Sequence, residues 1–282
     1  MHHRVPMLDL SDSERLLANA ALTIDRRDAE ILLAGCWRRS RSQLLASSGE
    51  AVPADVARCF SDVLRQRASG VPVAYLLGRR EFWSLDFTVN PAVLVPRPET
   101  ELLVQRVLDL ITTPAAAVAD LGTGSGAIAI ALAHERPQWR VLGTDASERA
   151  LAVARANGER LAGGRVEWAQ GDWYSALAGR RFDALASNPP YVAGDDPVLL
   201  EDGLRHEPRA ALTPGGDGFA ALATLINGAH EHLRPGGWLA LEHGTTQGEH
   251  LRSLLVARGF THVTSHRDLA GHERVTEGKL AP

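Results

Sequence analysis

The sequence predicts an α/β protein: a mostly parallel sheet covered by helices on both faces, preceded by a small all-α segment. From about residue 115, short apolar runs alternate with helical stretches, which is the pattern of parallel strands joined by crossover helices. A glycine cluster joins the first of these runs to the helix that follows it. The last two apolar runs have no helix between them, which predicts a terminal antiparallel hairpin.

Residues 10–70 predict the all-α segment. Asp25 is placed to cap one helix, and Pro53 suits the first turn of another helix that ends near Gly70. These positions indicate a compact helical unit.

After the helical segment, residues 81–84 and 86–89 predict two short strands in a hairpin. A helix is expected to begin near Pro98. The strands expected after it are Ala117–Leu121, Arg140–Asp145, Arg165–Ala169, Phe182–Ser187, Trp238–Glu242, Thr261–Ser265 and Glu273–Leu280. The helices expected between them include Ala127–His134, Glu148–Glu159 and Gly218–Leu233.

The composition is that of an ordinary globular protein, with 282 residues of which 45% are hydrophobic and 23% charged. The net charge of −4 disfavours a dedicated nucleic-acid-binding protein, which usually carries a basic excess. Lys279 is the one lysine of the chain, so a lysine-bearing phosphate loop is absent and a Schiff-base lysine is not expected.

The two cysteines, Cys36 and Cys59, form no Cys-x-x-Cys pair. We expect both to be free thiols in a reducing compartment. The N-terminal residues lack the apolar core of a secretory signal, and no run of roughly 18 apolar residues is present. The sequence therefore predicts a soluble, cytoplasmic protein.

The glycine cluster reads Asp120-Leu121-Gly122-Thr123-Gly124-Ser125-Gly126 and lies between a strand and a helix. Glycines let the backbone turn tightly and approach a ligand closely. Asp145, at the end of the next strand, can accept hydrogen bonds from both ribose hydroxyls of an adenosine. Together these residues predict a binding site for an adenosine-containing cofactor.

The glycine spacing and the charge of Asp120 select among such cofactors. Nicotinamide oxidoreductases show Gly-x-Gly-x-x-Gly, in which a helix N-terminus meets a pyrophosphate, whereas this chain has Gly-x-Gly-x-Gly after an aspartate. A carboxylate there suits a cationic ligand. S-Adenosylmethionine carries an ammonium and a sulfonium group and no phosphate, so it is the favoured cofactor.

Asp172 and Trp173 follow the third strand, at the same edge of the sheet. Asp172 could accept a hydrogen bond from the adenine amino group, and Trp173 could line the adenine slot. The alternative that Trp173 only packs between helix and sheet stays open.

The most specific stretch is Ser187-Asn188-Pro189-Pro190-Tyr191, directly after the fourth strand. Two adjacent prolines fix φ and remove two N–H donors, and the residue before them is held extended. The loop therefore presents oxygen acceptors, the side-chain carbonyl of Asn188 and the backbone carbonyl of Pro189, beside the flat ring of Tyr191. These groups suit a planar amino group, in a carboxamide or an aminopurine, which needs orientation rather than a strong base. A bare proline-rich turn is the alternative.

These motifs resemble the class I S-adenosylmethionine-dependent methyltransferases that modify planar amino groups. A wider resemblance, covering nearly the whole chain and weakest before residue 70, is to the HemK-like protein-(glutamine-N5) methyltransferases. It rests on the segments Pro72–Gly78, Leu94–Glu101, Glu207–Leu212 and Leu241–Gly244.

The resemblance implies a Rossmann-like fold with a seven-stranded sheet, and methylation of the glutamine side-chain amide in the Gly-Gly-Gln loop of peptide chain release factors. It implies a helical substrate-recognition domain over 1–75, a hairpin linker over 76–95 and a catalytic domain over 96–282. The residues implied to bind S-adenosylmethionine are Gly122, Thr123, Gly124, Ser125, Gly126, Asp145, Asp172, Trp173 and Asn188. The residues implied to receive the glutamine are Asn188, Pro189, Pro190 and Tyr191, with Asn188, Pro189 and Tyr191 acting in catalysis.

The main alternative is a nucleic-acid adenine-N6 methyltransferase, because adenine also presents an amino group. Such an enzyme usually needs a basic surface, and this chain is slightly acidic. A non-catalytic adenosine-binding module would not require the intact loop at Asn188. No His-Glu-x-x-His spacing is present, so no metal site is expected. A membrane partner and a nucleic-acid partner are not expected either. Arg97 and Glu99 are expected to border the active site, whereas the sequence pattern indicates no role for Trp139 or for residues 193–196.

Overall fold

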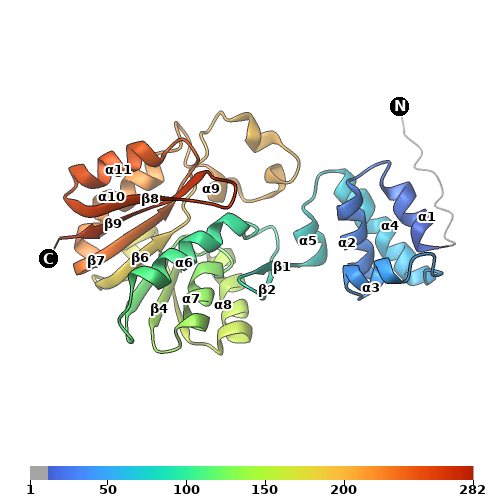
Figure 1. Cartoon of the computed structure of the whole chain (residues 1–282), viewed down its shortest axis with the longest axis horizontal. Helices are drawn as coiled ribbons and strands as arrows, with labels where there is room; N and C mark the ends of the chain where they lie inside the picture. The colour runs from blue at the N-terminus through green and yellow to red at the C-terminus, as the bar shows by residue number, and fades with distance from the viewer. Residues whose placement is uncertain (1–11, 282) are drawn as a thin grey trace. The chain divides into compact units, whose positions relative to one another are not determined.

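In the computed structural model of this chain, residues 12–281 are described. The chain divides into two compact units, Met1–Gly78 and Arg79–Pro282, and each is described by itself (Figure 1). Since the hairpin expected over residues 81–89 falls within the second unit, the boundary between the units precedes it.

The first unit is helical, as the sequence predicts. Asp25 caps the second helix by accepting a hydrogen bond from the backbone N–H of Arg27 at 2.8 Å, and the fourth helix begins directly after Pro53. Fully buried leucines and Phe60 fill the space between the helices. The helices are α1 (Ser13–Ala20), α2 (Arg26–Cys36), α3 (Arg41–Ala46), α4 (Ala54–Ala68) and α5 (Val73–Leu77).

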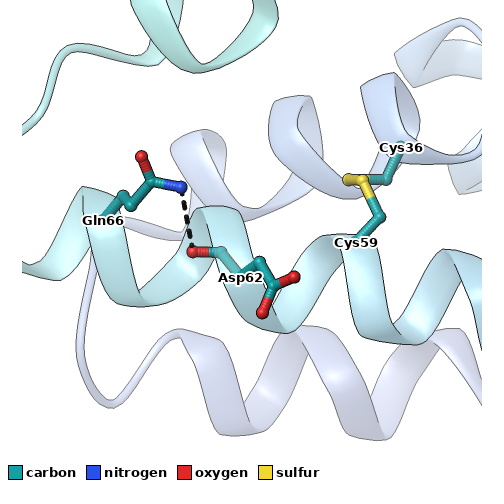
Figure 2. The surroundings of a disulfide bond; sticks show 4 residues. All are labelled: Cys36, Cys59, Asp62 and Gln66. Atoms are coloured by element: carbon teal, nitrogen blue, oxygen red, sulfur yellow. Dashed lines mark hydrogen bonds between the residues drawn. A yellow bond between two sulfur atoms is a disulfide. The ribbon is translucent and has the colours of Figure 1, made fainter.

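Cys36 and Cys59 are joined by a disulfide bond, so the expectation of two free thiols is wrong (Figure 2). Cys36 is the last residue of α2, and Cys59 lies in α4, which packs against α2. The two Cα atoms are 5.9 Å apart, a separation that a disulfide spans. The spacing of cysteines along the chain does not reveal which helix faces pack together, and the expectation failed for that reason.

The second unit opens with an antiparallel hairpin of β1 (Arg79–Phe82) and β2 (Leu85–Thr88). Asn157 attaches it to the rest of the unit: its Oδ1 accepts from the Thr88 N–H at 2.9 Å, and its Nδ2 donates to the carbonyls of Thr88 and Ser125, each at 3.0 Å. Because Ser125 belongs to the glycine loop, one buried amide ties the hairpin to that loop.

The seven-stranded sheet has the order β5-β4-β3-β6-β7-β9-β8. Strands β3 to β7 are parallel, and β9 is antiparallel to both β7 and β8, which confirms the predicted terminal hairpin. The strands are β3 (Ala117–Leu121), β4 (Arg140–Asp145), β5 (Val166–Gln170), β6 (Phe182–Ser187), β7 (Leu233–Glu242), β8 (Phe260–Arg267) and β9 (Glu273–Leu280).

Helices cover both faces of this sheet (Figure 1). One face carries α6 (Glu101–Leu110), α7 (Ala127–Glu135) and α8 (Glu148–Ala162), and the other carries α10 (Ala220–His232) and α11 (Gly248–Ala257). Buried leucines of α10 and α11 meet those of the strands and form the main core. The short helices are η1 (Pro98–Thr100), η2 (Trp173–Leu177), η3 (Pro197–Leu200), η4 (Leu204–His206) and α9 (Arg209–Leu212).

Trp168 of β5 occupies a slot that three glycines from three different elements leave open. A Cβ atom on Gly143 of β4 would lie 2.4 Å from the indole, and one on Gly158 of α8 would lie 2.8 Å from it. The third glycine is Gly126, immediately before α7, where a Cβ would lie 2.9 Å from the same ring. Close packing of this kind leaves no room for a methyl group.

The structure accounts for Trp139 and residues 193–196. The Trp139 indole is buried and donates to the carbonyl of Thr113 at 3.1 Å, which holds the segment before β3. Asp196 caps η3 by accepting from the Val198 N–H at 2.9 Å. Both features stabilise local structure.

Candidate active site

The point where the chain reverses direction across the sheet lies between β3 and β6. Strand β3 has β4 on one side and β6 on the other, so the loops that follow these strands diverge at their carboxyl ends. In open parallel sheets this crevice is where ligands bind. The glycine loop follows β3, and the loop that begins with Asn188 follows β6.

A cavity of about 330 Å³ opens at this point. The predicted site residues that line it are Gly122, Gly124, Asp145, Asp172, Trp173, Asn188 and Pro190. Its remaining lining residues are Ala92, Val93, Leu94, Ala146, Ser147, Ala150, Gly171, Pro208, Ala210 and Ala211. Segments distant in sequence, including parts of Leu94–Glu101 and Glu207–Leu212, therefore complete the wall of the cavity.

A second, smaller cavity of about 50 Å³ is lined by the predicted residues Thr123 and Ser125, and it shares Gly122, Gly124 and Asn188 with the first. The other three predicted residues, Gly126, Pro189 and Tyr191, line neither cavity. Their proposed roles stay predictions.

The backbone of the glycine loop is bent sharply. Gly122 has a φ of 75°, and a Cβ at that position would lie 3.4 Å from the Trp173 ring. The N–H groups of Gly122 and Thr123 both donate to the carbonyl of Thr144, at 2.9 and 2.7 Å. These bonds hold the loop against β4 and consume two of its donors.

Asp145 lies beside this loop, as predicted. Its Oδ2 accepts from the Gly124 N–H and its Oδ1 from the Ser147 N–H, each at 2.9 Å. Each carboxylate oxygen keeps a lone pair, so Asp145 can still accept from two hydroxyl groups. Burial raises the pKa of this carboxyl group, and the two backbone N–H groups oppose that effect.

Asp120 is completely buried beneath the glycine loop. Its Oδ2 accepts from the Thr123 hydroxyl at 2.5 Å and from the Ala129 N–H at 3.2 Å, while Oδ1 has no hydrogen-bond partner among the described residues. Burial raises the pKa of Asp120 to about 7, and the charge of Asp145 adds to the shift. A buried carboxylate in this condition is stabilised by a nearby positive charge.

The charges around the main cavity fit a cationic cofactor. Of the described residues that line it, Asp145 and Asp172 are acidic, and none is lysine or arginine. A pyrophosphate would find no cationic side chain there, whereas the negative charge of this lining suits a ligand that carries positive charge.

Trp173 contacts both the cavity and the core, and its role beside an adenine stays a prediction. Its ring lines the cavity next to Gly122, and it also packs against the core cluster. Its φ of 44° is unusual for a residue with a side chain. Asp172 lines the same cavity and is exposed.

Asn188 lines both cavities. Its Nδ2 donates to the hydroxyl oxygen of Thr100 at 3.1 Å. The preceding residue, Ser187, donates its hydroxyl to the carbonyl of Leu121 at 2.6 Å, which ties the end of β6 to the end of β3. The loops that follow β3 and β6 are thereby tied to each other.

Tyr191 lines neither of the two cavities. Its hydroxyl donates to Glu242 Oε1 at 3.3 Å, and its carbonyl accepts from Gln247 Nε2 at 3.1 Å. Burial, followed by the negative charge of Glu242, raises the pKa of the phenol well above its usual value. Tyr191 therefore stays protonated and is not a general base.

Sequence reasoning missed three polar residues around this site: Thr100, Glu207 and Glu242. Glu207 is buried and accepts from Arg97 at 2.5 Å and from the Val95 N–H at 2.9 Å. Arg97 lines the small cavity, as expected, whereas Glu99 lines neither. All three lie in segments that carry the family resemblance, which was the available signal.

Within residues 12–281, no group of three or more histidine, cysteine, aspartate or glutamate side chains is arranged to hold a metal ion. In the same part of the chain, no helix has the length and apolarity needed to cross a bilayer.

Comparisons with known proteins agree with this geometry. The family model "Methyltransferase small domain" matches residues 98–221, and the model "PrmC N-terminal domain" matches residues 10–78. The release factor glutamine methyltransferase of Xylella fastidiosa (strain Temecula1) is 48% identical over 94% of this chain and 96% of its own length. This chain belongs to the release factor glutamine methyltransferase family.

The family extends along the whole chain. The release factor glutamine methyltransferase of Salmonella typhimurium is 44% identical over 100% of this chain and 98% of its own length. A crystal structure of a methyltransferase from Pyrococcus furiosus shares the fold, with a TM-score of 0.55 and 19% identity over 79% of this chain and 100% of that one. The fold is that of the class I S-adenosylmethionine-dependent methyltransferases.

Proposed function

We propose that this protein transfers a methyl group from S-adenosylmethionine to the side-chain amide nitrogen, N5, of the glutamine in the Gly-Gly-Gln loop of peptide chain release factors. The observation that carries the proposal is the position of Asn188. It lines the cavity shared with the glycine loop and Asp145, in a chain 48% identical over 94% of its length to a named release factor glutamine methyltransferase.

The residues proposed to hold the cofactor follow from the geometry of the cavity. Asp145 would accept from the ribose hydroxyls, and Trp173 and Asp172 would bound the adenine. Gly122 and Gly124 allow the backbone to approach the ligand, while the buried charge of Asp120 favours a cation above it. S-Adenosylmethionine supplies an electrophilic methyl group attached to a sulfonium.

Asn188 Oδ1 and the Pro189 carbonyl would accept the two hydrogens of the substrate amide and direct its nitrogen toward the methyl group. The methyl carbon would form a bond to the amide nitrogen as its bond to the sulfonium sulfur breaks, and the nitrogen would then release one proton to water. Because neutral acceptors stabilise the positive charge that develops on nitrogen, no strong base is needed before attack. Tyr191, which stays protonated, contributes the position of its ring and no base.

We further propose that the helical N-terminal unit binds the release factor outside its glutamine loop, and that the enzyme acts in the cytoplasm without a nucleic-acid partner. The similarity of residues 10–78 to the PrmC N-terminal domain supports a role tied to this family's substrate.

The test uses labelled S-adenosylmethionine with either a release factor or DNA, followed by mapping of the label. We expect label on the glutamine of the Gly-Gly-Gln loop and none when that glutamine is replaced by alanine. Label on adenine, with none on the release factor, would contradict the proposal and favour the adenine-N6 alternative.

A further inference from the structure

The amino ends of the parallel strands border another cavity, with a volume of about 290 Å³. It shares no lining residue with the two cavities of the candidate active site. Strand β4 runs from Arg140, which lines this cavity, to Asp145, which lines the main cavity, so the two lie at opposite ends of the sheet. We call it the arginine cavity, and its lining residues are Ala117, Arg140, Val141, Leu142, Glu167, Arg180, Arg181, Phe182 and Arg234.

Four of the residues that line the arginine cavity are arginines, and one is acidic. Arg140 is the first residue of β4, Arg180 and Arg181 directly precede β6, and Arg234 is the second residue of β7. The sheet therefore gathers arginines from distant parts of the chain at one of its edges. Because the whole chain has a net charge of −4, this concentration of positive charge runs against the overall composition.

Two of the four arginines are held in place by carboxylates. Arg180 Nη1 donates to Glu167 Oε2 at 2.7 Å, and Arg234 Nη1 donates to Asp183 Oδ2 at 2.7 Å. Asp183 is itself fixed, because its Oδ2 also accepts from the Ala117 N–H at 2.7 Å. A guanidinium has five N–H groups, so both arginines keep donors that a ligand can use.

The other two arginines, Arg140 and Arg181, are exposed, and their side chains have no hydrogen-bond or ion-pair partner within residues 12–281. The one acidic residue of the lining, Glu167, already pairs with Arg180. The arginine cavity therefore carries two positive charges that no carboxylate of its lining compensates. Such charges repel each other, and a bound anion would stabilise both.

We propose that the arginine cavity binds a phosphate group with two negative charges, as inorganic phosphate or as the phosphate monoester of a small metabolite. A guanidinium matches the oxygen atoms of a phosphate with two parallel N–H···O bonds. A phosphate monoester has a charge of about −2 at neutral pH, which balances Arg140 and Arg181 together. This inference does not depend on the proposed function, because the site lies away from the cofactor and the acceptor loop.

The size of the arginine cavity favours a small molecule over a nucleic acid. A water molecule occupies about 30 Å³ in the liquid, so the cavity holds a phosphate group together with a small organic group. The buried side chains of Val141, Leu142 and Phe182 supply an apolar surface for that group. A nucleic-acid strand instead presents one charge per phosphate along its length and requires positive charge spread over a surface.

The test is a calorimetric titration of the whole protein with inorganic phosphate and, separately, with glycerol 3-phosphate, at constant ionic strength. We expect one saturable site, and a Kd that rises at least about tenfold when Arg140→Gln and Arg181→Gln are combined. Tighter binding of glycerol 3-phosphate would identify an organic monoester as the ligand, and tighter binding of inorganic phosphate would identify the free ion. If neither probe shows saturable binding up to about 10 mM, the proposal is wrong.

A matched control combines Arg58→Gln with Arg258→Gln. This pair removes the same charge from two other exposed arginines, one in α4 and one directly after α11, and neither lines the arginine cavity. The Kd for the phosphate probe should then change by less than about twofold. Both double variants should melt at the wild-type temperature. Equal weakening of binding in the two double variants would show only a general effect of net charge and would overturn the proposal.

Two competition measurements locate the bound phosphate. Saturating S-adenosylmethionine should leave the Kd for the phosphate probe unchanged, because the main cavity lies at the other end of the sheet. Competition between the two would place the phosphate in the main cavity and contradict the proposal. An RNA oligonucleotide without a terminal phosphate should not displace the probe. Displacement that requires Arg140 and Arg181 would overturn the proposal in favour of a nucleic-acid backbone.

Discussion

The two loops that form the site both offer hydrogen-bond acceptors, but their backbones differ in conformational freedom. The glycine loop after β3 relies on conformational freedom, with φ values of 75°, 56° and 84° at its three glycines, and spends its N–H groups on Thr144 and Asp145. The loop after β6 relies on rigidity, because Pro189 and Pro190 have no N–H groups. Both loops therefore offer acceptors, and the site favours ligands that donate hydrogen bonds or carry positive charge.

The largest effect is expected in the rigid loop. Asn188→Ala should lower kcat by about 10²–10³-fold, because one preorganised acceptor is lost in the transition state. The Kd for S-adenosylmethionine, measured by calorimetry, should change far less than kcat. A turnover close to that of the wild type would show that Asn188 does not accept a hydrogen bond from the substrate, and the contrast between the two loops would then have no functional meaning.

In the glycine loop, substitutions should change the stability of the protein. Gly126→Ala places a Cβ 2.9 Å from both Ile130 and Trp168 at a φ of 84°, which should lower the free energy of unfolding by about 2–3 kcal/mol. Gly124→Ala is the matched control, because its φ is 56° and nothing lies within 4 Å of the added atom. That variant should lose only about 1 kcal/mol. Equal losses in denaturant unfolding would mean that packing against Trp168 is unimportant.

Asp145→Ala should weaken binding of S-adenosylmethionine by about tenfold, since hydrogen bonds to a charged acceptor are lost. Calorimetry provides the measurement, and kcat at saturating cofactor should change less than in Asn188→Ala. An unaltered affinity would exclude the ribose role of Asp145.

The smallest effect concerns the pH dependence of cofactor affinity. Asp120 has a pKa of about 7 without ligand, and a bound cation would lower it. The complex then holds fewer protons than the free enzyme, so affinity should rise by a few-fold as pH increases through about 7.

Calorimetry in two buffers of different ionisation enthalpy would measure the proton released on binding. Comparison with Asp120→Asn removes the contribution of the titrating amino group of the cofactor itself. The same release in both proteins would assign the proton to another group.

The strands of the catalytic unit could be predicted closely because each apolar run ends at a polar or glycine residue. The bounds of β3, β4 and β6 are those expected, and their carboxyl ends bring Asp145 and Asn188 to one cavity. The bond between Thr100 and Asn188 joins residues 88 apart in the chain. No periodicity encodes such a contact.

The features that the sequence did not predict were mainly contacts between buried side chains. In the sequence, Glu242 resembles any polar residue at the start of a loop after a strand. Only the packed structure shows that its side chain is 1% exposed. Cys36 and Cys59 likewise became partners through helix packing rather than through spacing. The ligand-binding roles assigned to the site residues stay predictions until they are measured.

The slot around Trp168 extends the influence of the site to helix α8. Gly158 lies there, and a side chain at that position would push the indole toward Gly126, from which the glycine loop leads back toward Gly122. The indole thus connects helix α8 to the glycine loop, whose residues 122–125 line the cavities. A bulky substitution at Gly158 is in this sense a mutation of the pocket, although it touches no ligand.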